Sequence, residues 1–137
     1  MITETATTAL ESYINSKGLE LPIYTPRGVE TMTYPCIQIG DSSADEDEVL
    51  DGVYEVSIEV AYIATPNANT DAGDTEEEIT DKSSEVYNVL SCEQMISILN
   101  IQPGIKVFDV FMGQLSSEER DGRSASVYNL ELVCCEV

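Results

Sequence analysis

The clearest pattern in the chain is a strict alternation of apolar and polar residues between positions 54 and 62. The apolar positions are Tyr54, Val56, Ile58, Val60 and Tyr62, and the polar positions between them include Glu55, Ser57 and Glu59. Successive side chains of a strand point to opposite faces of its sheet. The segment is therefore predicted to be an antiparallel strand with one covered face and one exposed face.

Two segments follow the helical period instead. Apolar residues at spacings of four, three and one, followed by Gly18, predict a helix over residues 4–17. A second helix is expected from Thr75 to about Leu90, because Thr75 and Glu78 have the spacing of a capping box. Its buried side is predicted to hold Ile79, Val86, Val89 and Leu90. Another helical turn is expected within residues 92–100.

The remaining apolar segments predict strands. Residues 19–24 contain Pro22, which lacks an N–H group, so they form a short edge strand at best. Residues 29–39 form a second strand, with Pro35 marking an edge or a bulge. Residues 105–115 and 124–137 read as a long hairpin joined by a polar loop at 116–123, with Tyr128, Leu130, Leu132 and Cys134 on one face. The order predicts a single α+β domain over residues 1–137, with a mostly antiparallel sheet of four to five strands and two helices packed on one face.

Composition permits a packed core but adds an unusual charge. Of the 137 residues, 42% are hydrophobic and 23% are charged, as in ordinary globular domains of this size. The 26 acidic and 6 basic residues give a formal net charge of −20. This charge argues against gripping nucleic acid, because such affinity comes from cations that neutralise phosphates. Two explanations of the net charge are left: it serves solubility alone, or it repels a polyanion that passes the protein.

The chain lacks the residues of the common catalytic systems. It has no histidine, which excludes Ser–His and Cys–His nucleophiles. The glycine-rich phosphate-binding patterns GxxxxGK(S/T) and GxGxxG are also absent from the sequence. We therefore expect no enzyme and no cofactor. The four cysteines lack CxxC spacing and are expected to be reduced and mostly buried. The absence of a long apolar run or a secretion signal predicts a protein made in the cytosol and not bound to a membrane.

One segment resembles a calcium loop in part. In "NANTDAGDTEEE", residues 67–78, Asn67, Asn69, Asp71 and Glu78 fall at positions 1, 3, 5 and 12 of an EF-hand loop. Ala72 stands where that loop needs glycine, and helix capping explains Glu78 without a metal. No metal site is therefore assigned, and calcium binding remains an alternative.

Two groups of charged residues are candidate interaction sites. The stretch "DSSADEDEVLD", residues 41–51, is predicted to be a solvated loop, and its candidates for an acidic rim or channel lining are Asp45, Glu46, Asp47 and Glu48. The second group lies in the terminal hairpin and pairs two cations with three acids: Arg120, Arg123, Glu118, Glu119 and Asp121. These residues either pair across a subunit contact or form weak surface pairs.

The order of the segments resembles that of the tail-terminator or tail-completion proteins of tailed bacteriophages. It comprises an N-terminal helix, a "LPIY" strand, a "YPCIQIG" strand leading into an acidic stretch, an alternating strand, a capped helix and a long final hairpin. The local signature consists of Tyr34, Pro35, Ile37, Ile39 and Gly40. The resemblance covers nearly the whole chain in pattern and order.

The resemblance implies a structural virion protein without catalytic residues. Such a subunit forms a homohexameric ring that caps the tail tube, contacts the neck or connector protein and lets DNA pass without specific binding. The chain would be assembled in the host cytoplasm and reside at the tail or neck of the virion. A neck stopper or head–tail adaptor ring is the nearest alternative. A monomeric acidic module that binds calcium or a basic partner is the other.

Overall fold

The computed structural model describes residues 2–25, 33–64, 76–91, 93–113, 115–120 and 123–137. Within these ranges the chain is α+β, as predicted. The elements in order are α1 (Ile2–Asn15), β1 (Ile23–Tyr24), β2 (Cys36–Glu46), β3 (Val53–Ile63), α2 (Glu76–Leu90), α3 (Met95–Leu99), β4 (Ile105–Met112), β5 (Ser116–Arg120) and β6 (Arg123–Glu136).

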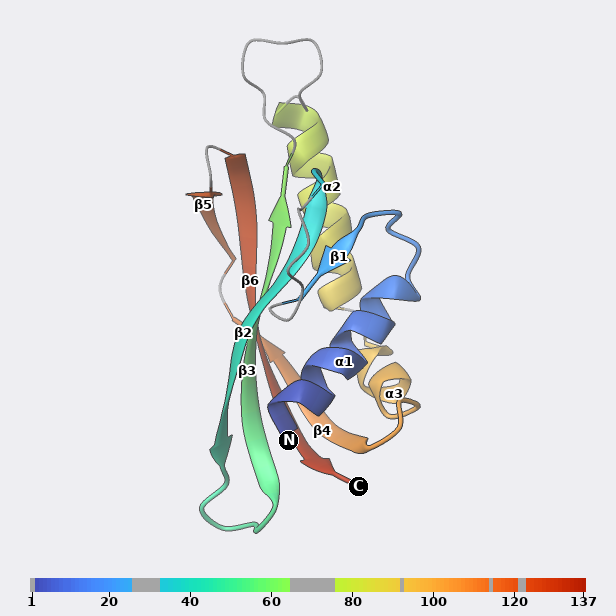
Figure 1. Cartoon of the computed structure of the whole chain (residues 1–137), viewed down its shortest axis with the longest axis vertical. Coiled ribbons are helices and arrows are strands. Elements are labelled where there is room, and N and C mark those ends of the chain that lie inside the picture. The colour runs from blue at the N-terminus through green and yellow to red at the C-terminus, as the bar shows by residue number, and fades with distance from the viewer. Residues whose placement is uncertain (1, 26–32, 65–75, 92, 114, 121–122) are drawn as a thin grey trace.

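The strands form one sheet in the order β1-β2-β3-β6-β4, with β5 pairing β6 beside this path (Figure 1). The described residues thus contain six strands, more than the four to five expected. β3 pairs with β6 along its whole length, from Val53 opposite Cys135 to Ile63 opposite Ala125. All pairings are antiparallel except the short one between β1 and β2. The sheet is therefore mixed: the pairings among β2, β3, β6, β4 and β5 are antiparallel, and the short pair at its edge is parallel.

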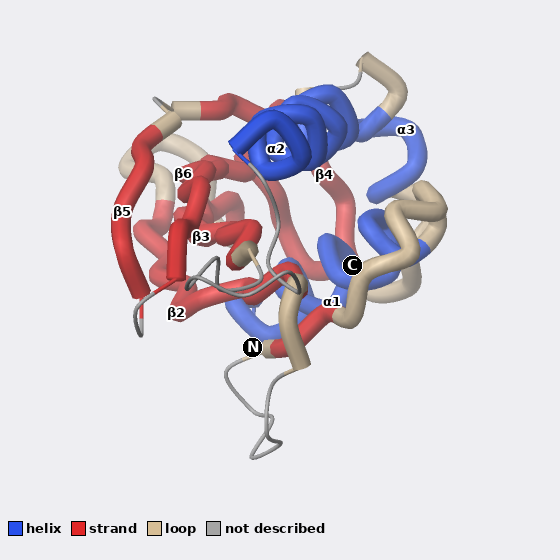
Figure 2. The backbone as a smooth tube through the Cα atoms, turned by 90° about the horizontal axis from the view of Figure 1, so that it is seen from above, coloured by secondary structure: helices blue, strands red, loops and turns tan. Residues whose placement is uncertain are grey.

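All three helices lie on one side of the sheet (Figures 1 and 2). The alternating apolar residues of β3 and β6 point toward them: Val56, Ile58 and Val60 are buried, as are Tyr128, Leu130, Leu132 and Cys134. This confirms the predicted faces of both strands. The expected helical turn after α2 is α3, whose Met95 and Leu99 complete the same core. Thr75 and the Glu78 side chain, which carry the predicted capping box, lie outside the described residues.

Two buried tyrosines hold α2 against the rest of the core. The Tyr13 hydroxyl of α1 donates a hydrogen bond to the Val89 carbonyl at 2.5 Å. The Tyr128 hydroxyl of β6 donates one to the Ser83 carbonyl at 2.6 Å. Both tyrosines are fully buried, so each satisfies its own hydroxyl while packing a large ring. α2 is thus held by one hydrogen bond from α1 and one from β6.

The predicted acidic loop is largely strand, which corrects its boundary. β2 continues past a bulge between Ile39 and Ser42 and pairs with β3 as far as Glu46, so only a short turn separates the two strands. Ser43 and Asp45 tolerate the strand conformation because their side chains lie on the face that no described helix covers. The end of β2 was not predicted as a strand because its polar residues lie on both faces and leave no apolar–polar alternation.

The polar segment at 116–123 is also not simply a loop. Ser116–Arg120 forms β5, which pairs with β6 from Ser116 opposite Val127 to Arg120 opposite Arg123. β6 has 14 residues and β4 only 8, so on the edge away from β3 the first half of β6 is not paired by β4. β5 supplies the backbone hydrogen bonds that this half requires. The predicted hairpin thus has a strand inside its connection.

A second, smaller core lies on the other face at the end of the sheet near Tyr34. It contains Cys36, Ala61, Ile63, Ala125 and Val127, with Tyr24 and Tyr34 packed against it. Cys36 and Cys134 are buried free thiols on opposite faces of the sheet, and Cys135 is half-buried. The expected burial is confirmed at Cys36 and Cys134, and Cys92 lies outside the described residues.

Candidate functional site

The sheet has one face that the described helices leave uncovered, and we call it the open face (Figure 2). It is formed by Ser43, Asp45, Glu55, Ser57, Glu59, Asn129, Glu131, Asp109 and Phe111. These residues come from β2, β3, β6 and β4. Over these residues the open face is polar and mostly acidic, and the smaller apolar core lies at its end near Tyr34.

Strand register arranges these side chains in rows across the sheet. One row runs Phe111, Glu131, Ser57 and Ser43, because each is the cross-strand partner of the next. The adjacent row runs Asp109, Val133, Glu55 and Asp45. Directly opposed side chains have Cβ atoms about 4.5–5.5 Å apart, and diagonal neighbours remain within reach of long side chains. Glu55 and Glu131 are such a diagonal pair.

Like charges on this face perturb one another. The Glu131 carboxylate raises the pKa of Glu55, and lost solvation, a hydrogen bond with Glu131 and the charges of Asp47 and Asp45 act in the same direction. A raised carboxyl pKa means that the folded state disfavours the charged form. The open face therefore retains its acidic residues at a cost to folding.

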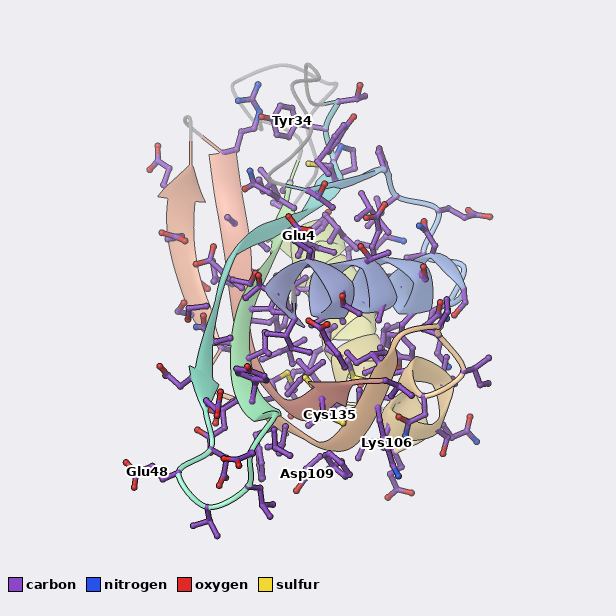
Figure 3. The ribbon with its side chains drawn as sticks, turned by 60° about the horizontal axis from the view of Figure 1, so that its bottom comes forward. Glu4, Tyr34, Glu48, Lys106, Asp109 and Cys135 are labelled. Atoms are coloured by element: carbon purple, nitrogen blue, oxygen red, sulfur yellow. The ribbon has the colours of Figure 1, made fainter. Side chains whose placement is uncertain are left out.

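Replacing Glu55 with glutamine is expected to raise the melting temperature slightly at neutral pH. The gain should shrink in high salt, which screens exposed charges, and as pH falls, because protonation of Glu55 relieves the same repulsion. Thermal unfolding at two salt concentrations and two pH values measures this. Glu48→Gln is the matched control, because Glu48 projects from the β2–β3 turn away from the body (Figure 3). An equal gain in the control would contradict local repulsion on the open face.

The four predicted acidic candidates do not form one group. Asp45 lies on the open face, whereas Glu46 is on the helix side, where it accepts a hydrogen bond from Tyr54 and raises the pKa of that phenol. Asp47 Oδ1 accepts hydrogen bonds from the N–H groups of Val49 and Leu50 at 2.8 and 3.0 Å, which lowers the Asp47 pKa. Glu48 is exposed at the turn. The structure therefore distributes these candidates, and the acidic residues of the open face come from four strands.

The described candidates of the terminal hairpin lie on β5 and at the start of β6, where Arg120 is the cross-strand partner of Arg123. Glu118 and Glu119 are exposed on β5. The Arg123 guanidinium lies over the Tyr34 ring, with 3.8 Å between its central carbon and the ring centroid. Arg123 thus contacts its own chain beside the smaller core. The Arg120 side chain and Asp121 lie outside the described residues.

A groove crosses the open face and has a volume of about 420 Å³. Its lining includes Phe111, Met112 and Gly113 together with Ser43, Ser57 and Glu131. The hollow arises because two serines and a glycine stand between larger residues. Phe111 keeps 53% of its surface exposed there.

The described part of the chain offers no group of three or more His, Cys, Asp or Glu residues arranged for a metal ion. Asn67, Asn69, Asp71 and the Glu78 side chain, which carry the calcium alternative, lie outside the described residues. Within the described ranges no helix is long and apolar enough to cross a membrane.

The chain matches no protein-family model and no curated protein. The site is therefore defined by its geometry alone.

Sequence reasoning missed Asn129, Glu131 and Phe111 as site residues. A signal existed for the first two, because they alternate with the buried Tyr128, Leu130 and Leu132. No local pattern places Phe111 beside Glu131, since that contact depends on the pairing of β4 with β6.

Proposed function

We propose that the chain is a ring-forming structural subunit at the junction of the capsid and tail of a tailed bacteriophage. Its best assignment is a tail terminator, a homohexamer that caps the tail tube and joins it to the neck or connector. The observation that carries this proposal is the two-faced sheet, with helices on one side and carboxylates on the other. It supports the resemblance already noted in the order of the segments.

A ring with the open faces turned inward would present carboxylates to its channel. DNA phosphates and carboxylates repel each other, and the net charge of −20 adds to this repulsion over the whole subunit. Counterion release, which drives proteins onto DNA, requires cations that this face largely lacks. Such a channel lets DNA pass without adhering to it.

Strand directions favour closure of a ring by sheet edges. β2, β3, β6 and β4 alternate in direction, so β4 at one edge is antiparallel to β2 near the other. β1 covers only Ile37 and Gln38 of β2, which leaves the rest of that edge without a strand partner among the described residues. A copy related by rotation presents its β2 antiparallel to β4, as an added strand requires.

Features of β4 explain how free subunits would avoid premature pairing. A bulge interrupts its register between Val107 and Asp109. Asp109 Oδ1 accepts a hydrogen bond from the Val110 N–H at 2.9 Å, and the Lys106 ammonium lies 5.5 Å from the centre of the Phe108 ring. Bulges and charged side chains are common protections of exposed edges. The tube end would then act as the template on which six subunits pair.

The test uses purified chain added to tail tubes assembled without it, viewed by electron microscopy. The expected result is a ring at one end of each tube, and Lys106→Glu is expected to abolish it by adding a carboxylate at the edge facing β2 of the neighbour. Lys17→Glu, the same charge change in the turn after α1, should leave the ring intact. A chain that binds only the capsid connector would favour the stopper or adaptor. A chain that binds neither would overturn the proposal.

A further inference from the structure

The groove beside Phe111 has a shape and lining suited to a flat cationic side chain. Phe111 forms one wall and Glu131 is its direct cross-strand partner, so an aromatic surface and a carboxylate flank the same hollow. Gly113 adds no side chain to the lining. Ser57, the next residue in the row, is too small to fill the space.

We propose that this groove binds an arginine side chain carried by a basic segment of a different protein. A guanidinium is planar, stacks on aromatic faces and forms paired hydrogen bonds with a carboxylate, whereas lysine offers only a compact charge. The same stacking already occurs within this chain, where Arg123 lies over Tyr34. Phe111 and Glu131 supply the two groups that the recognition requires.

Charge complementarity identifies the occupant as a basic segment and excludes a second copy. Glu131 and Glu59 line the groove, and Glu55 lies in the adjacent row. A second copy would bring 26 acidic residues and 6 basic ones to an already acidic surface. A segment rich in arginine gains from the same field that repels DNA.

The site lies on one subunit and therefore stands or fails independently of the ring. The monomeric chain is titrated into a fluorescein-labelled peptide in which four arginines alternate with glycines, at physiological salt, and anisotropy is recorded. Peptides with lysine or with neutral citrulline in place of arginine are the ligand controls. We expect the arginine peptide to bind several-fold more tightly than the lysine peptide, and the citrulline peptide not to bind.

Variants locate the binding. Phe111→Ala should weaken it by about tenfold, since stacking is lost without any change in charge. Phe111→Leu should weaken it similarly while preserving apolar volume, which guards against misfolding of the alanine variant. Glu131→Gln should also weaken it, whereas Glu48→Gln, the same change at the distant turn, should stay within about twofold.

Three outcomes would overturn the proposal. Equal binding of the arginine and lysine peptides, or equal losses in Glu131→Gln and Glu48→Gln, would reveal general attraction to an acidic protein. Unchanged binding in both Phe111 variants would place the peptide elsewhere.

Discussion

Tyr128→Ala is expected to lower the free energy of unfolding by about 3–5 kcal/mol, the usual cost of deleting a buried aromatic ring. Tyr128 is fully buried on β6 and joins the sheet to α2 through its hydrogen bond to the Ser83 carbonyl. Its removal leaves a cavity and takes away that bond. Urea unfolding followed by circular dichroism measures the loss through the midpoint and slope.

Two further variants separate packing from hydrogen bonding. Tyr128→Phe keeps the ring and should cost about 1 kcal/mol, the net value of an ordinary hydrogen bond. Tyr87→Ala removes a tyrosine from α2 that is 45% exposed, and should cost much less than Tyr128→Ala. Similar losses in Tyr87→Ala and Tyr128→Ala would contradict the role of Tyr128 in holding α2 against the sheet.

Raising the pH from about 9 to 11 is expected to remove several kcal/mol of stability. Burial raises the pKa of the Cys36 thiol from 9.0 to about 11 despite the opposing charge of Arg123, and burial likewise raises that of Cys134 to about 11, assisted by Cys135. In this window the unfolded chain loses these protons while the folded chain retains them, so stability falls as pH rises. Each thiol contributes about 2–3 kcal/mol by the full shift. Burial also raises the pKa of Tyr128, which acts in the same direction at higher pH.

The measurement is urea unfolding at a series of pH values under reducing conditions. Cys36→Ala and Cys134→Ala should each flatten the decline between pH 9 and 11, whatever their effect at pH 7. Cys135→Ala removes only the smaller contribution to the raised pKa of Cys134 and should flatten the decline less than either of these variants. A decline as steep in the double variant Cys36→Ala with Cys134→Ala as in the unchanged chain would refute the role of the two thiols.

The open face links the fold to the proposed function. The carboxylates of the open face repel one another, as the raised pKa of Glu55 indicates. Apolar burial on the other face of the sheet offsets this cost to folding. The same charges would repel DNA in a channel and attract arginine in the groove. The tube experiment and the peptide titration test these two roles separately.

Helices and strands that carry a regular spacing of apolar residues were predictable from the sequence. The alternation from Tyr54 to Tyr62 specified β3 and its buried face, and the apolar stripe of α1 specified the helix to within two residues at each end, Ile2–Asn15 instead of 4–17. Both signals suffice because one covered face of a strand or helix imposes a period on its own residues. The net charge and the lack of histidine likewise follow from composition alone.

The lengths of β2 and β5, and the contacts between polar side chains of different strands, depend on long-range strand pairing. At the end of β2 the helix-side residues are Ser42, Ala44 and Glu46, which give no apolar alternation, so the strand is imposed by pairing with β3. β5 forms because β6 is longer than β4 and its first half pairs with β5 instead. The groove needs Phe111, Glu131 and Ser57 from three strands, and long-range register that no local period encodes brings them into one row.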